Sequence, residues 1–339
     1  MNTYFIAIKS ALILFPFIAV FITFPYMVFQ YRKYGSIPWF RSAVLYSFVL
    51  YVLCMYLLII LPLPSKEEVL NTTGPITQLL PFQFVRDFFK ETIFVIDQPE
   101  TWLPAMKQNC FLQVVCNILL FVPFGIYMRY YFRCNWKKVF LFSFLLSLFF
   151  ELTQLSGLYG IYKRPYRLFD VDDLFLNTSG GMVGFFIEPV LGYLLPSKKA
   201  LDEMAYKKGK RVSVIRRLLA FMIDGVVIVL IISFGSFAVG GMYFILVLYF
   251  TKGYTPGMWI LRIRVVDKGG NALSLWQAVI RNGILYYGIS MPFVLIGLIL
   301  LERLFSKKES KNILFYEWMS NTRCVSVIQE EYCYNTVSL

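Results

Sequence analysis

Long apolar runs recur along this chain of 339 residues, and they constrain its fold more than any other feature. A helix needs about 20 apolar residues to cross the hydrocarbon core of a bilayer. Seven apolar runs lie at residues 4–29, 42–63, 110–128, 139–158, 174–195, 218–233 and 237–250. An eighth run, at 284–301, is interrupted by Pro292. The chain is therefore predicted to be an all-α integral membrane protein, a polytopic helical bundle with seven to eight transmembrane segments.

The composition excludes several other classes of protein. Hydrophobic residues make up 58% of the chain and charged residues only 16%, too few for the polar surface of a soluble domain of this length. Histidine is absent. This absence rules out a Ser-His-Asp triad, a histidine general base and any histidine-containing metal site. The six cysteines show no Cys-x-x-Cys spacing and are interpreted as small core residues, and no cofactor is expected.

The charges of the loops predict how the chain crosses the membrane. Four loops together hold 20 Lys and Arg residues and three acidic residues: 30–41, 129–138, 196–217 and 251–283. The alternate loops, 64–109 and 159–173, hold seven basic and nine acidic residues. The positive-inside rule places the first set in the cytoplasm and the N-terminus outside. The side of the C-terminus depends on whether 284–301 spans fully, and the cytoplasm is favoured. The net charge of +13 thus reflects loop chemistry, and no nucleic-acid partner is expected.

A polar, strongly basic stretch separates two apolar blocks and marks a domain boundary. The predicted division is a first domain at 1–195, a linker at 196–213, a second domain at 214–328 and a tail at 329–339. The favoured interpretation of the linker is an ordinary cytoplasmic loop, and contact with anionic lipid headgroups is the alternative. In the second domain, residues 255–267 are expected to form a short β-like cytoplasmic strand. Assembly into a homo-oligomer is left open.

Three acidic residues fall inside predicted spans: Glu151, Glu188 and Asp224. A carboxylate at the centre of a bilayer costs about 3 kcal/mol, so it is usually paired or functional. Glu188 is expected to reach the membrane surface or to pair with a lysine of the basic linker.

Polar residues near the outer end of two neighbouring spans are predicted to face one another. Glu151 and Gln154 share one helix face, because they are three residues apart. If the next span starts near Phe169, a second face carries Asp170, Asp173 and Asn177, with Arg167 at its mouth. These residues predict a polar pocket that opens to the outer leaflet. The alternative is a buried ion pair, such as Glu151 with Arg167, that only locks two helices together.

Three motifs in the first half resemble those of a known family. They are NILLFVPFG at 117–125, ELTQL at 151–155 and RLFDVDDLFLNTSGGMVG at 167–184. Their order and spacing resemble the VanZ-like family, named for a teicoplanin-resistance accessory protein, over about residues 1–195. The resemblance implies a multi-pass protein of the bacterial plasma membrane. It also implies that the family's characteristic polar residues are Asn117, Glu151, Gln154, Arg167, Asp170, Asp173 and Asn177.

The second half carries a different signature. RRLLAFMIDG places Arg217 at the start of a span and Asp224 seven residues later, and FYEWMSNTRCV follows near the C-terminus. Together these motifs resemble the RDD family, named for one arginine and two aspartates, over residues 214–328. Arg217 and Asp224 match the first two of these residues. Glu317 stands at the position of the last aspartate and keeps its charge on a longer side chain. Direct pairing of Arg217 with Asp224 would need both side chains to extend, so other partners are expected.

Three functions remain open at this point. The leading hypothesis is a non-enzymatic or weakly catalytic envelope protein whose first half binds a membrane lipid or a lipidated small molecule, such as a lipoglycopeptide antibiotic, from the outer leaflet. The second is transport of ions or small molecules through the second half by Arg217, Asp224 and Glu317. The third is a membrane hydrolase or transferase that uses Glu151 as general base, with Asp170 and Asp173 holding a divalent cation.

Overall fold

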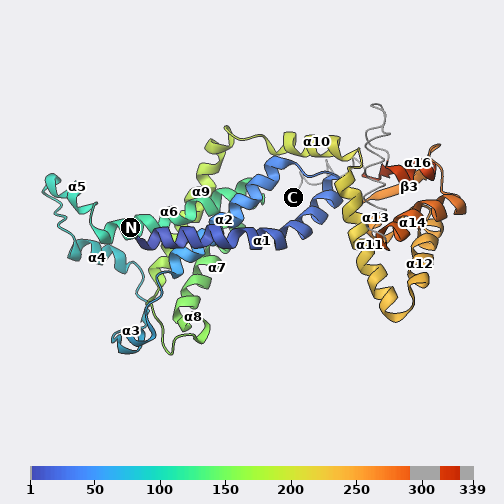
Figure 1. Ribbon diagram of the computed structural model, residues 1–339. Coiled ribbons are helices and arrows are strands. Elements are labelled where there is room, and N and C mark those ends of the chain that lie inside the picture. Colours follow the sequence, from blue (N-terminus) through green and yellow to red (C-terminus); the bar gives the residue numbers. More distant parts are fainter. Residues whose placement is uncertain (1, 291–313, 329–339) are drawn as a thin grey trace. The chain divides into compact units, whose positions relative to one another are not determined.

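The computed structural model describes residues 2–290 and 314–328 (Figure 1). The chain divides into two compact units, and each is described by itself. The first consists of Met1–Val20 and Phe40–Ser197, and the second of Phe21–Trp39 and Lys198–Leu339. The predicted span at 284–301 is described only as far as residue 290, and the tail at 329–339 lies outside the described residues. The predicted domain boundaries and the side of the C-terminus therefore stay predictions.

Five helices are long and apolar enough to cross a membrane. They are α1 (Asn2–Tyr34), α2 (Trp39–Ile60), α6 (Asn109–Tyr130), α7 (Trp136–Leu155) and α9 (Val171–Gly192). A shorter apolar helix, α12, covers Phe237–Phe250. The described residues are mostly helical, with two small sheets of two strands each. The predicted class, an all-α membrane protein, is confirmed, whereas the number of spans stays a prediction.

Helices α6, α7 and α9 pack closely in the first unit (Figure 1). Phe121 of α6 and Phe150 of α7 are fully buried between them, with their ring centroids 6.2 Å apart. Gly180 and Gly184 of α9 bring its backbone against that of α6, because a Cβ at either position would lie about 2 Å from a carbonyl oxygen of α6. The two glycines, four residues apart, thus form a small-residue pair that packs α9 against α6.

A folded segment connects α2 to α6 and lies at one end of the first unit (Figure 1). It contains α3 (Lys66–Asn71), β1 (Thr77–Gln78), α4 (Gln83–Glu91), a 3-10 turn (Pro99–Thr101) and α5 (Trp102–Ala105). After α7 come the short α8 (Gly157–Gly160) and β2 (Phe169–Asp170). Strand β1 pairs in parallel with β2, so the connecting segment is attached at the N-terminus of α9.

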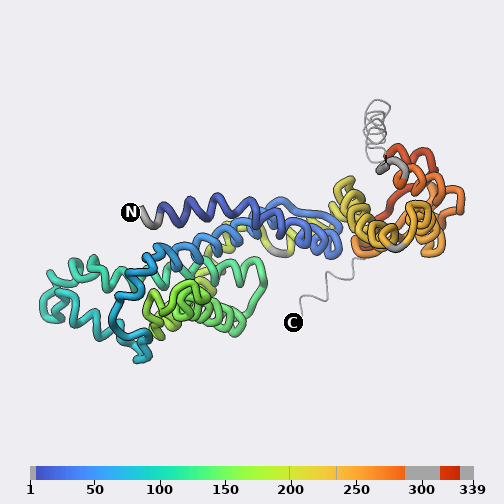
Figure 2. Tube along the Cα trace, turned by 60° about the horizontal axis from the view of Figure 1, so that its bottom comes forward, coloured from blue at the N-terminus to red at the C-terminus, as the bar shows by residue number. Residues whose placement is uncertain are grey.

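The second unit contains short helices around one small sheet. Its elements are α10 (Lys198–Gly209), α11 (Val214–Phe234), α12, α13 (Pro256–Ile260), β3 (Ile263–Asp267), α14 (Leu275–Ser290), α16 (Phe315–Met319) and β4 (Thr322–Ser326). The elements from α11 to β4 gather in one body (Figure 2, yellow to red). Strands β3 and β4 are antiparallel, and Val265 lies opposite Cys324. The core beneath the sheet includes Leu248, Leu261 and Ile263, all fully buried.

One predicted element of the second unit folds differently from the expectation, and the predicted linker contains a helix. The predicted strand at 255–267 is a strand only in its second half, β3. Its first half is α13, because Thr255 caps the helix by accepting a hydrogen bond from Met258 N, and Pro256 occupies the first helical position. Within the predicted linker, Lys198–Gly209 form α10, whose Ala205 is fully buried.

Candidate functional site

Glu151 joins α7 to the N-terminus of α9. It lies in the last turns of α7 with 3% of its surface exposed. Its Oε2 accepts a hydrogen bond from the backbone N–H of Asp170 at 2.9 Å. Asp170 is the N-cap of α9, where backbone N–H groups are otherwise unpaired and a negative charge is favoured. Glu151 therefore stabilises the start of the neighbouring helix, through a backbone group that the sequence does not reveal.

Asp173 and Asn177, one turn apart on α9, connect it to α6 and α7. Asp173 Oδ1 accepts a hydrogen bond from Asn117 Nδ2 of α6 at 2.5 Å. Asn177 Nδ2 donates to Ser147 Oγ of α7 at 2.9 Å, and its buried Oδ1 has no partner. The predicted face of α9 thus meets polar groups on two helices. Ser147 is a member of this cluster that the sequence reasoning missed.

Gln154 and Arg167 meet at the end of α2. Both donate to the carbonyl oxygen of Ile59, Gln154 from Nε2 at 3.4 Å and Arg167 from Nη1 at 2.9 Å. In the described part of the chain, Arg167 forms no ion pair with Glu151. The example given as the alternative to a pocket, an ion pair between Glu151 and Arg167, is therefore not formed. Arg167 instead satisfies a backbone carbonyl that α2 leaves open at its C-terminus.

Asp170 lies at the edge of the cluster. Its Oδ1 accepts hydrogen bonds from Asp172 N at 2.8 Å and, more weakly, from Gln78 Nε2 at 3.4 Å. Burial raises the pKa of Asp170 above its ordinary value, and the Asp172 N–H opposes this rise. Among the described residues, no group of three or more His, Cys, Asp or Glu side chains is placed to hold a metal ion. The proposed cation ligands, Asp170 and Asp173, instead accept the hydrogen bonds named above.

Asp172, which the sequence reasoning passed over, anchors the segment between α2 and α6. It is 2% exposed, and its two oxygens accept hydrogen bonds from Phe82 N at 2.6 Å and Phe84 N at 2.9 Å. Phe82 has a φ of 64°, in the left-handed region that costs about 1 kcal/mol or more for a bulky residue. The Phe82 ring stacks on Phe175 of α9 at a centroid distance of 5.7 Å. These contacts hold a strained turn at the N-terminus of α4.

In the second unit, the structure brings Arg217 and Glu317 together. Arg217 Nη1 lies 2.7 Å from Glu317 Oε2, and Arg281 Nη2 lies 3.5 Å from Glu317 Oε1. Arg281 was not singled out from the sequence, although it is 1% exposed. Its other contacts are Thr322 Oγ1 at 2.7 Å and Cys324 Sγ at 3.1 Å. Burial raises the pKa of the Cys324 thiol to about 11. One carboxylate is thus shared by two buried guanidinium groups.

Asp224, the third member of the predicted charged set, has separate partners. Its Oδ2 accepts a hydrogen bond from Thr255 Oγ1 at 2.5 Å, and its Oδ1 accepts one from Gly257 N at 2.7 Å. The expectation that Arg217 and Asp224 have different partners is met. Asp224 caps the N-terminus of α13, where a carboxylate satisfies an open N–H group and complements the helix dipole.

Two further charged residues are buried, Arg216 and Glu188. Arg216 was not singled out from the sequence, and one partner of Glu188 was not foreseen. Arg216 is fully buried and donates to the carbonyl oxygens of Leu261 and Arg262 at 2.7 and 2.8 Å, as well as to other backbone groups of the second unit. Glu188 in α9 forms an ion pair with Arg129 of α6, whose Nε lies 3.0 Å from Glu188 Oε2. From the sequence alone, Arg129 was not considered as a partner of Glu188.

Apolar spans, glycine-packed helices and buried charges bonded between helices define a multi-pass helical membrane protein. Comparison with family models shows which families match the two halves of the chain. Residues 48–192 match VanZ/LLP1, and residues 211–312 match the RDD family. The chain therefore carries a VanZ-like domain followed by an RDD domain, in the order that the motifs predicted, and both families indicate a protein of the cell envelope. The RDD match ends before Glu317, so the assignment of that residue to the family pattern stays a prediction.

Comparisons with curated proteins and with solved structures gave no significant match. The role of each candidate site residue therefore rests on the contacts described above. These contacts bring five polar residues of the VanZ-like motifs together at the first turns of α9: Asn117, Glu151, Asp170, Asp173 and Asn177. Gln154 and Arg167 bond instead to the end of α2, and the RDD set divides into an Arg217–Glu317 pair and a separately bonded Asp224.

Proposed function

We propose that the VanZ-like domain binds a lipid or a lipidated small molecule at the outer face of the bacterial plasma membrane. The polar cluster around Glu151, Asp170 and Asp173 would contact the polar part of the ligand. The exposed apolar segment beside it would contact the acyl chain. Within the VanZ-like resemblance, an acylated glycopeptide antibiotic such as teicoplanin is the leading candidate ligand.

The observation that carries this proposal is that Asp172 anchors the segment between α2 and α6, which exposes apolar side chains. The segment connects two membrane-spanning helices, so both of its ends meet the same membrane surface. It exposes large apolar side chains: Leu79, Leu80, Phe82, Phe89, Ile93, Ile96 and Leu103 are each more than half exposed. Apolar patches of this kind mark sites that contact lipid or a partner. The Asp172 carboxylate fixes this patch to the same helix N-terminus that carries Asp170 and Asp173.

The chemistry of the cluster fits a ligand with hydrogen-bond donors. Glu151, Asp170 and Asp173 contribute carboxylates, and Asn177 Oδ1 is a buried acceptor without a partner. Amine and hydroxyl groups, which sugars and peptides carry, would complement these acceptors. The apolar segment adds affinity, because burying one large aliphatic side chain contributes about 1.5–3 kcal/mol, or at least tenfold in affinity.

Direct binding tests the proposal without relying on a phenotype. The full-length protein in nanodiscs is titrated with fluorescent teicoplanin and with a glycopeptide that lacks the acyl chain. We expect the acylated compound alone to bind tightly. Ile96→Ser and Leu103→Ser, at exposed apolar positions, should each weaken binding about tenfold. Tyr193→Ser is the control, because Tyr193 is even more exposed than Ile96 and Leu103 but lies at the opposite end of α9 from Asp170.

A charge-removing variant tests the polar cluster. Glu151→Gln keeps an oxygen that can accept the hydrogen bond of Asp170 N, so the fold should be preserved while the charge is lost. We expect weaker binding at an unchanged protein level, and loss of any resistance that the wild-type chain confers on cells. Equal binding of acylated and acyl-free compounds, or unchanged binding by all these variants, would refute the proposed function.

A further inference from the structure

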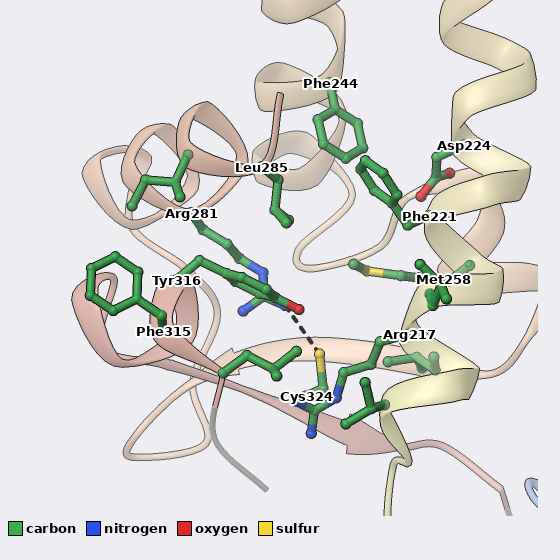
Figure 3. A pocket seen from close by; sticks show the side chains of 16 residues that line it. Arg217, Phe221, Asp224, Phe244, Met258, Arg281, Leu285, Phe315, Tyr316 and Cys324 are labelled. Carbon is green, nitrogen blue, oxygen red and sulfur yellow. Dashed lines mark hydrogen bonds between the residues drawn. The ribbon is translucent and has the colours of Figure 1, made fainter. Parts of the chain in front are cut away.

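A cavity of about 200 Å³ lies inside the second unit, and its lining shares no residue with the cluster that carries the proposed function (Figure 3). Its walls come from α11, α12, α13, β3, α14, α16 and β4. Most of the lining is apolar, and Phe221, Phe244, Met258 and Leu285 enclose its upper part in the view of Figure 3. An apolar cavity of about 150 Å³ is large enough to hold benzene. The cavity therefore has room for a short length of hydrocarbon.

Two arginine side chains line the same cavity. Arg217 and Arg281 share the carboxylate of Glu317, so these three ionised groups together carry one excess positive charge. The Nε atoms of both arginines are buried and have no hydrogen-bond partner. An unpaired donor in an apolar site costs about 1–3 kcal/mol, and more when it is charged. This end of the cavity therefore complements a ligand that supplies acceptor oxygens and a negative charge.

The other charged group in the lining is already satisfied. Both oxygens of Asp224 accept hydrogen bonds, from Thr255 Oγ1 and from Gly257 N. Asp224 follows Arg217 by seven residues on α11, a rise of about 10 Å along the helix. In Figure 3 it lies beside Phe221, among the apolar side chains. An anion at the arginine end would therefore be separated from this carboxylate by most of the cavity.

We propose that this cavity binds the end of an apolar chain that carries a carboxylate or phosphate group. The anionic oxygens would accept hydrogen bonds from Arg217 and Arg281, and the hydrocarbon would occupy the space between Phe221, Phe244 and Leu285. A free fatty acid and an anionic phospholipid both offer this chemistry. The inference rests on the RDD-like unit alone and is independent of the function proposed for the VanZ-like domain.

The test uses the full-length protein in phosphatidylcholine nanodiscs, with decanoate as the probe and decanol as its uncharged counterpart. Calorimetric titration should show saturable binding of decanoate and at least tenfold weaker binding of decanol. Replacing part of the phosphatidylcholine with phosphatidylglycerol identifies the source of the natural ligand. Competition would point to the lipid headgroup, whereas undiminished decanoate binding would point to a free acid.

Two variants test the two ends of the cavity separately. Ala220→Leu adds volume to the apolar lining without changing any charge, and it should abolish decanoate binding. Arg217→Gln should weaken decanoate binding at least tenfold and leave decanol binding unchanged. Gly225→Ala is the control on the same helix, because no atom lies within 4 Å of the added Cβ. If Arg217→Gln fails to fold, two results still test the proposal. They are the preference of the wild type for decanoate over decanol and the effect of Ala220→Leu on decanoate binding. Equal affinity for decanoate and decanol, or unchanged decanoate binding by Ala220→Leu, would overturn the proposal.

Discussion

Substitution of Gly184 by alanine tests whether close contact between α6 and α9 builds the VanZ-like domain. A Cβ at this position would lie 2.0 Å from Val122 O and 2.9 Å from Val122 C, whereas ordinary contacts begin at 3.4 Å. The obstacle is backbone and cannot rotate away, so the two helices would have to part by roughly an ångström. Overpacking of this kind costs about 1–3 kcal/mol, which exceeds the 0.5–1 kcal/mol that alanine gains over glycine inside a helix. We expect a net loss of about 1 kcal/mol.

Gly192 provides the matched control on the same helix. The nearest atom to a Cβ there is Glu188 Oε1 at 3.7 Å, so Gly192→Ala should be neutral or stabilising by up to about 1 kcal/mol. Unfolding of the purified protein in mixed detergent micelles, titrated with dodecyl sulfate, compares the two variants. Parting of the helices should also lengthen the Asn117–Asp173 hydrogen bond and weaken ligand binding. If Gly184→Ala is as stable as Gly192→Ala, the close helix contact is not what holds this domain together.

Three further outcomes are expected. The folded-state pKa of Asp170 is raised, so its stabilising contribution is present below its unfolded pKa, about 3.9, and is lost as pH rises through the folded-state value. Thermal unfolding scans should show this decline in the wild type and a flatter profile in Asp170→Asn. Asp224→Ala leaves Thr255 Oγ1 and Gly257 N without their acceptor and should cost about 3 kcal/mol in the same assay. In a chain without native cysteines, Lys207→Cys should resist a membrane-impermeant thiol reagent on intact cells while Glu100→Cys reacts, and the reverse result would overturn the predicted orientation.

The sequence predicted the spans and the motif residues because each leaves a local signal. Apolar runs of the required length became helices, since a helix satisfies its own backbone groups in a bilayer. The i, i+3, i+7 spacing placed Asp173 and Asn177 on one face of α9, where they meet Asn117 and Ser147. Helical periodicity is therefore sufficient to gather most of the polar cluster.

The partners of Asp172 and Arg216 could not be predicted, because these partners are mostly backbone atoms. Asp172 bonds to N–H groups some 90 residues earlier in the chain, and every residue except proline carries such a group. Adjacent Arg216 and Arg217 look alike in sequence, and family resemblance selected Arg217. The fully buried one is Arg216, which bonds to the carbonyl oxygens of Leu261 and Arg262, some 45 residues later in the chain. Side-chain patterns carry no information about such acceptors.

The glutamate at position 317 can be understood from the geometry of its two arginine partners. The RDD resemblance expects an aspartate there, and the extra methylene of glutamate lengthens the side chain. In the structure, Oε2 contacts Arg217 and accepts a hydrogen bond from Leu314 N, while Oε1 lies near Arg281. One carboxylate thereby serves two guanidinium groups that are almost fully removed from water. Removal of one member of a buried ion cluster is costly, because the remaining charges stay buried without compensation. The longer side chain therefore lets a single acidic residue keep two arginines at the cavity wall, and it leaves the net positive charge that an anionic ligand would neutralise.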